Sequence, residues 1–229
     1  MENKKIKAAC LTNAFLVDMV IFATICMFTG FRFMPGDLIL ETTKIEMFKF
    51  FTVDSNILLG IAAFILMIYQ LKVYARKIDS IPKWVYLLKL SATGCVTLTL
   101  MVTACYLAPF SKFGYFEFFK NSNLFFHFLV PVVSIISFMF LDNTNKIRFK
   151  DTFVCVIPVV IYAIYYIINV FTHLENGKTT PKYDFYGFVK GGIGSIVFVA
   201  VLILLVTFIF DIILYGINRK LYKEKGKEV

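Results

Sequence analysis

The stretch Phe48–Asn56 reads FKFFTVDSN and opens an apolar segment that continues to about Val73. An α-helix needs about 20 mainly apolar residues to cross the hydrocarbon core of a bilayer, and this segment is long enough. Its first turns carry two hydroxyls, a carboxylate and an amide, from Thr52, Asp54, Ser55 and Asn56. Polar groups at the start of a membrane helix are costly unless they have partners or a function. The stretch therefore predicts a membrane helix and a candidate site together.

Five further segments are long and apolar enough to span a membrane. The six predicted helices cover residues 8–30, 50–73, 85–108, 124–141, 153–171 and 191–215. Composition agrees, because 59% of the 229 residues are hydrophobic and 17% are charged, against about 45–50% and about 25% in soluble domains. The first segment has no small-residue cleavage site and is read as a retained helix. We predict an all-α, polytopic integral membrane protein with one domain over residues 1–229.

The positive charges indicate the orientation of the chain. With a cytoplasmic N-terminus, 15 Lys and Arg residues lie in the inner connections and tails, and 8 lie in the outer connections. This bias predicts that both termini are cytoplasmic. The net charge of +9 lies in loops and tails and not on a folded polar domain, so we expect no nucleic-acid partner. Helices two, four and six then begin on the outer side.

Thr52 and His127 therefore lie at a similar depth, each in the first turn of its helix. A threonine hydroxyl becomes a nucleophile when a base removes its proton, and histidine titrates near neutral pH. Pro131 has no N–H and is expected to leave the carbonyl of His127 without its helical partner. Two alternatives stay open. The first alternative is that Thr52, or one of its polar neighbours, only caps the helix. The second is that His127 is a structural histidine bonded to a carbonyl.

Other polar residues could contribute to the same site. Ser55 and Asn56 follow Thr52 by three and four residues and share its helix face. On the fifth helix Tyr162, Tyr166 and Asn169 share a face and could line a polar pocket, or belong to an interfacial belt. These five residues are the candidates for substrate binding or oxyanion stabilisation.

Asp18, Asp211 and Asn218 are further charged or amide residues in or beside the apolar segments. Asp18, midway along the first helix, needs a partner, a proton-linked role or local water. Asp211 and Asn218, near the inner end of the sixth helix, are expected to snorkel to the interface. No cofactor or metal is expected, since there are two histidines, no HExxH motif and no phosphate-binding loop. The five scattered cysteines are expected to be packing residues.

Three stretches together resemble a known membrane-protein family. KFFTVDSN (49–56), NLFFHFLVP (123–131) and KYDFYGF (182–188) resemble, in order, motifs of the androgen-induced and androgen-dependent TFPI-regulating proteins and their six-helix bacterial relatives. The DSN after Thr52 is more similar to the bacterial branch, which implies a multi-pass protein of a bacterial cell membrane.

The resemblance implies a threonine-dependent hydrolase of carboxylic esters. Animal members split fatty acid esters of hydroxy fatty acids, and by motif position Thr52 is the nucleophile and His127 the essential histidine. The expected partners are thus the membrane and a lipid or lipophilic ester substrate. A second hypothesis is a binder or transporter of a small lipophilic molecule that performs no chemistry.

Overall fold

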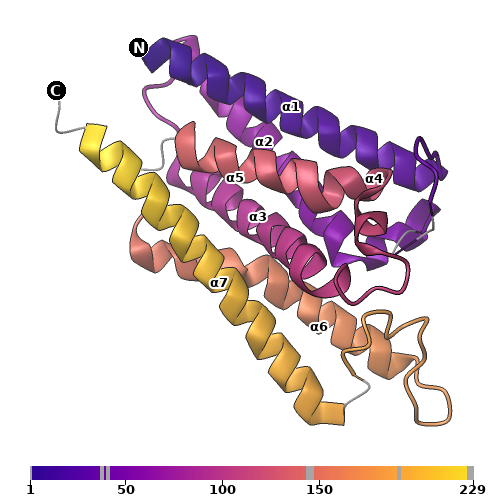
Figure 1. Ribbon diagram of the computed structural model, residues 1–229. Coiled ribbons are helices and arrows are strands. Elements are labelled where there is room, and N and C mark those ends of the chain that lie inside the picture. The colour runs from indigo at the N-terminus through magenta and orange to yellow at the C-terminus, as the bar shows by residue number, and fades with distance from the viewer. Residues whose placement is uncertain (1, 37–38, 40–41, 143–146, 190–191, 226–229) are drawn as a thin grey trace.

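The computed structural model describes residues 2–36, 39, 42–142, 147–189 and 192–225 as a bundle of helices (Figure 1). Among these residues, six helices are long and apolar enough to cross a membrane. They cover Lys4–Thr29, Phe51–Tyr74, Lys83–Leu107, Ser122–Phe140, Phe149–Thr172 and Gly194–Tyr222. Extended backbone pairs only in an isolated bridge between Glu175 and Lys178 in the part of the chain described. The predicted all-α, polytopic architecture is confirmed.

Three of the spans are single α-helices, and three are composite. The α-helices are α1 (Glu2–Thr29), α2 (Phe51–Tyr74), α3 (Lys83–Val102), α4 (Ser122–Leu124), α5 (Val130–Phe140), α6 (Ile157–Thr172) and α7 (Gly192–Lys225). Short 3₁₀ helices η1 (Lys44–Lys49), η3 (Tyr115–Phe119) and η5 (Phe149–Val156) precede α2, α4 and α6. Two π-helical turns, η2 (Thr103–Leu107) and η4 (Phe125–Leu129), extend α3 and join α4 to α5. Such turns are rare and frequently occur at functional sites.

The central element is α3, in which every residue from Lys89 to Thr99 is buried. It contacts α2 and α5 on one side and η5, α6 and α7 on the other. Its middle is built from small residues, Ser91, Ala92, Thr93 and Gly94, which allow neighbouring helices to approach closely. The large apolar side chains of α1, α6 and α7 that face outward include Phe15, Ile161 and Phe198. These surfaces fit contact with lipid.

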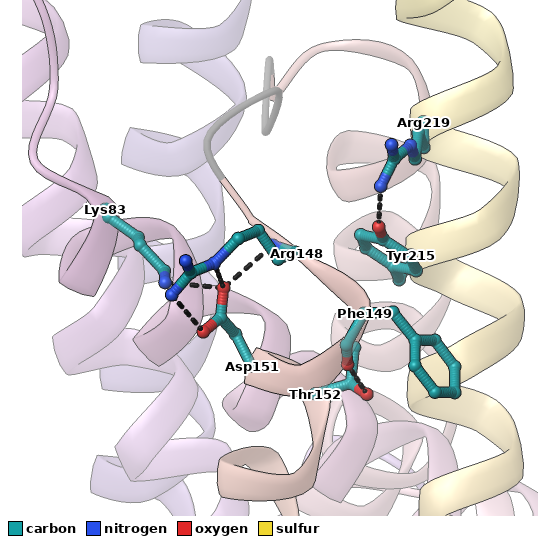
Figure 2. A network of polar contacts seen from close by, with 7 residues as sticks. All are labelled: Lys83, Arg148, Phe149, Asp151, Thr152, Tyr215 and Arg219. Carbon is teal, nitrogen blue, oxygen red and sulfur yellow. Dashed lines mark hydrogen bonds and ion pairs between the residues drawn. The ribbon is translucent and has the colours of Figure 1, made fainter.

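Polar contacts fasten the end of the bundle at which α3 starts, and we call this the inner end because it is the predicted cytoplasmic side. Figure 2 shows the contacts around Asp151 of η5. Its carboxylate lies 2.5 Å from Lys83 Nζ and accepts the backbone N–H of Arg148 at 2.8 Å. On α7, Arg219 donates to the Tyr215 hydroxyl, and the Tyr215 ring lies 6.5 Å from that of Phe149, between centroids. The inner half of α7 is thereby attached to η5.

The expectation that Asp211 and Asn218 extend to the interface is wrong. Asp211 and Asn218 do not snorkel, because both side chains are 0% exposed. Asn218 Nδ2 donates to the carbonyls of Phe138 and Asp142 at 2.6 and 2.7 Å. Asp18 lies on the outward surface of α1, and no described residue donates a hydrogen bond or ion pair to it. Of the three alternatives for Asp18, a protein partner is not found within the described part of the chain, which leaves a proton-linked role or local water.

Candidate functional site

Thr52 is the second residue of α2 and does not cap it. The cap is Phe50, in an extended conformation (φ −89°, ψ 129°), and its side chain makes no capping bond. The N–H groups of Val53 and Asp54 donate to the Phe50 carbonyl at 3.0 and 3.2 Å. The start of α2 thus has no capping bond from Thr52, and the Thr52 hydroxyl is available for another role.

The Thr52 side chain lines a mainly apolar cavity of about 110 Å³ at the outer end of the bundle. Its walls come from the start of α2, from α3 with η2, from α6, from residues 186–189 and from α7. The hydroxyl-bearing residues in the lining include Thr52, Thr99, Thr103, Tyr162, Tyr166 and Tyr186. A cavity with apolar walls and a few convergent polar groups is the usual form of a small-molecule site.

The turn that follows residue 183 positions a phenol beside Thr52. The buried Asp184 carboxylate accepts the Tyr166 hydroxyl at 2.6 Å and the Val189 N–H at 3.3 Å. The Tyr186 N–H donates to the same Tyr166 hydroxyl at 3.3 Å. These bonds fold the segment so that the Tyr186 side chain enters the cavity wall.

The Tyr186 hydroxyl accepts the N–H of Phe51, the first residue of α2, at 3.2 Å. The hydroxyls of Thr52 and Tyr162 lie within its hydrogen-bonding reach. Burial raises the pKa of Tyr186 to about 12, so the phenol keeps its proton at neutral pH. Tyr186 was not among the residues predicted for the site, although it lies in the third quoted motif.

The π-helical turn η4 changes which carbonyl Pro131 leaves unpaired. The Val130 N–H donates to the Phe125 carbonyl, five residues back. In this register the missing N–H of Pro131 faces Phe126 and not His127, so the expectation for His127 is wrong. Asn56 of α2 supplies the replacement donor, because its Nδ2 lies 3.1 Å from the Phe126 carbonyl.

The His127 imidazole is buried, with 1% of its surface exposed, and has a backbone partner. Its Nδ1 lies 2.8 Å from the Phe118 carbonyl. A carbonyl only accepts, so Nδ1 carries a proton and, in the neutral ring, Nε2 carries the lone pair. The contact matches the structural reading of this histidine, and it also selects the tautomer that a general base with Nε2 would need.

Asn56 links the two predicted catalytic segments. Its Nδ2 donates to the Thr52 carbonyl at 2.7 Å as well as to the Phe126 carbonyl, beside His127. Among the described residues, no hydrogen bond joins the Thr52 hydroxyl to the imidazole, and His127 is not part of the cavity lining. The structure thus brings the two backbone segments together and leaves the two functional groups without a direct bond.

The other predicted site residues divide between the cavity and its surroundings. Tyr162 and Tyr166 line the cavity, which is mainly apolar and not the polar pocket suggested for their shared face with Asn169. Ser55 donates to the Thr52 carbonyl at 3.1 Å and lies 3.3 Å from the Thr99 hydroxyl, behind the cavity wall. Asn169 lines a separate depression on the surface. Ser55 and Asn56 therefore support Thr52, and Asn169 is distant from the cavity lining.

A buried polar group at the inner end was missed from the sequence, and we call it the inner polar cluster: Asn13, Gln70, Lys89, Asp142 and Asn218. Lys89 Nζ donates to Asn13 Oδ1 at 2.8 Å, and Asn13 Nδ2 donates to Gln70 Oε1 at 3.1 Å. Gln70 Nε2 in turn lies 3.2 Å from an Asp142 oxygen. The signal available in the sequence was a lysine inside an apolar segment. Its partners are remote in the chain.

None of the family models, curated proteins or solved structures compared with the chain matches it. Within the described residues, no group of three or more His, Cys, Asp or Glu side chains is placed to hold a metal ion. All five cysteines are free thiols. The chemistry of the site is therefore argued from its own hydroxyl, phenol and imidazole groups.

Proposed function

We propose that the protein is an intramembrane hydrolase of lipid esters in which Thr52 is the nucleophile. The observation that carries the proposal is that Thr52, whose hydroxyl is not used for capping, lines an apolar cavity at the start of a membrane helix. The family resemblance carried by the segments around Thr52, His127 and Tyr186 supports the same chemistry.

The geometry suggests how an ester would be held. The acyl chain occupies the cavity between α3, α6 and α7, whose surface is mainly apolar. The ester carbonyl lies at Thr52, near the positive end of the α2 dipole. The neutral phenol of Tyr186 donates to the oxyanion that develops on the carbonyl oxygen. Ser55 and Asn56 were among the candidates for oxyanion stabilisation from the sequence, but both donate hydrogen bonds to the Thr52 carbonyl. We therefore assign this role to Tyr186.

The reaction proceeds in two steps, acylation of Thr52 and hydrolysis of the acyl-threonine. His127 Nε2 takes the Thr52 proton through one water molecule, and Oγ1 attacks the ester carbonyl carbon. The C–O bond to the alcohol breaks, and the alcohol leaves with the proton from the imidazolium. Water then attacks the acyl-threonine, gives its proton to His127 and releases the fatty acid, while Thr52 regains its hydroxyl. The Phe118 carbonyl holds the base in one tautomer throughout.

A second candidate is a binder of a lipophilic molecule that performs no chemistry. It is favoured by the absence of a direct hydrogen bond between Thr52 and His127 in the described structure. This candidate uses the same cavity and the same hydroxyl groups, but it requires no role for the imidazole. The two proposals therefore differ in the consequence of changing His127.

Turnover by the purified protein in lipid nanodiscs distinguishes the two candidates. The substrates are fatty acid esters of hydroxy fatty acids and simpler acyl esters, with the released acid measured by mass spectrometry. Thr52→Val removes the hydroxyl and keeps the shape, and Thr103→Val is the matched control because Thr103 lines the same cavity.

We expect turnover to be lost in Thr52→Val and retained in Thr103→Val. His127→Gln should lower turnover by about 10²–10⁴-fold, the usual contribution of a general base. Ligand-induced thermal stabilisation of the wild type without any released acid would favour the binder. Full turnover by Thr52→Val would exclude Thr52 as the nucleophile.

A further inference from the structure

Asp211 of α7 is packed against a glycine of α3 in the middle of the bundle. The side chain is 0% exposed, and a methyl group added at Gly94 would lie only 2.0 Å from Asp211 Oδ1. The carboxyl group therefore occupies the space that any side chain at position 94 would fill. The close contact between α3 and α7 beside Gly94 therefore depends on the absence of a side chain at position 94 and on the protonation state of Asp211.

Neither carboxyl oxygen of Asp211 has a hydrogen-bond partner among the described residues, although both are buried. The titratable groups that face it are the thiols of Cys95 on α3 and Cys155 on η5. An ionised carboxylate without a cation or donors is far more costly to bury than a neutral one, so the group neutralises. In this arrangement Asp211 carries a proton.

Asp211 lies between the half of α7 that is packed into the bundle and the half that lines the cavity. Within the described part of α7, the buried side chains begin at Thr207 and lie in its inner half: Thr207, Asp211, Leu214, Tyr215 and Asn218. The outer half instead forms one wall of the cavity, through residues that include Ile196, Ala200 and Ile203. Figure 1 shows this N-terminal half of α7 extending away from α1, α2 and α5. Asp211 thus lies near the boundary between the attached half and the half that covers the cavity.

We propose that Asp211 is a proton-binding site, and that its protonation holds α7 against α3 and keeps the cavity narrow. Loss of the proton creates a charge that cannot stay at Gly94, so α7 moves outward and the cavity widens toward the membrane. The inference rests on the proposed function only for the identity of the molecule in the cavity, a lipid ester. Its test needs no turnover.

Infrared spectroscopy and amide exchange in nanodiscs test the two parts of the proposal. The carbonyl band of a protonated carboxyl should be lost in Asp211→Asn and retained in Asp18→Asn. Amide exchange of residues 194–206, corrected for its intrinsic pH dependence, should rise in the wild type by up to about tenfold per pH unit as the pH approaches that of half-release of the proton, and level off above it, as linkage to one proton requires. In Asp211→Asn, which stays neutral, it should not rise.

Gly94→Ala provides a second variant, because its methyl group excludes the carboxyl group at every pH. We expect fast exchange of residues 194–206 in Gly94→Ala under neutral conditions. Gly60→Ala, a matched change at the contact of α2 with Val20, should leave α7 unaffected. An unchanged protonated-carboxyl band in Asp211→Asn, or an equal rise of exchange with pH in this variant and the wild type, would overturn the proposal. A protein without hydrolase activity that passes both tests would refute only the proposed function.

Discussion

Replacing Lys89 with methionine tests the inner polar cluster. Methionine keeps most of the apolar stem of the lysine and removes only the ammonium group. That group is 0% exposed, donates to Asn13 Oδ1 at 2.8 Å and is the cation whose attraction acts on the buried Asp142 carboxylate. Removing one of two buried charges that attract each other costs up to about 3–5 kcal/mol, because the remaining charge stays buried without compensation. We expect a loss of this size in the free energy of unfolding of Lys89→Met.

The assay is reversible unfolding in mixed micelles, followed by circular dichroism, with two further variants. Lys83→Met removes a lysine from the same helix, where the side chain is 32% exposed and pairs with Asp151. Partly exposed pairs contribute about 0–1 kcal/mol, so Lys83→Met should be close to the wild type. Adding Asp142→Asn to Lys89→Met removes the uncompensated charge and should restore most of the lost stability.

The pH dependence of Lys89→Met follows from the pKa of Asp142. Burial raises this pKa, and attraction to Lys89 opposes the rise. Without Lys89 the pKa of Asp142 in the folded protein rises further above its value in the unfolded chain. Stability then falls as pH increases from the unfolded value of about 3.9 toward the folded pKa.

The deficit of Lys89→Met should therefore be smaller at about pH 5 than at about pH 8. Equal stabilities of Lys89→Met and Lys83→Met at neutral pH would refute this account of the cluster. A double variant no more stable than Lys89→Met alone would also refute it.

Three further results are expected from changes around the cavity. Asn56→Leu removes both hydrogen bonds of the Asn56 amide group to backbone carbonyls and should cost about 2–3 kcal/mol in thermal unfolding. Pro131→Ala restores a backbone donor opposite Phe126 and should recover part of that loss in the double variant; complete additivity would contradict the π-helical register. Tyr166→Phe removes the donor to Asp184 and should cost about 1.5–3 kcal/mol and weaken binding of a fluorescent acyl lipid. Unaltered binding would show that the turn does not position the cavity wall.

The number and the approximate positions of the membrane helices followed from the sequence, because each needs a long apolar run that is visible locally. The departures occur where a few residues change the helix type. The fourth span begins as α4, passes through the π turn at Phe125–Leu129 and continues as α5. Pro131 predicts that one backbone hydrogen bond of the helix is missing. Which carbonyl loses its donor depends on the helical register, and in the π register it is the carbonyl of Phe126, which accepts a hydrogen bond from Asn56 instead.

The candidate site was predictable only in part for the same reason. Thr52, Tyr162 and Tyr166 stand out as polar residues on predicted helix faces, and all three line the cavity. Tyr186 lies in a connection whose fold depends on the bond between Asp184 and Tyr166. Lys89 lies in an apolar segment that gives no sign of its contacts, because Asn13 comes from α1 and Asp142 from the connection after α5. Pairings of this kind depend on tertiary packing and leave no local pattern.

The measurement that tests the proposed function most directly is the location of a covalent adduct. The protein in nanodiscs is treated with a lipophilic fluorophosphonate, digested and analysed by tandem mass spectrometry. The proposal predicts a single phosphonylated residue, Thr52, with labelling abolished in Thr52→Val, retained in Thr103→Val and slowed in His127→Gln. An adduct on another residue, or no adduct in a preparation that releases fatty acid, would contradict the assignment of Thr52 as the nucleophile.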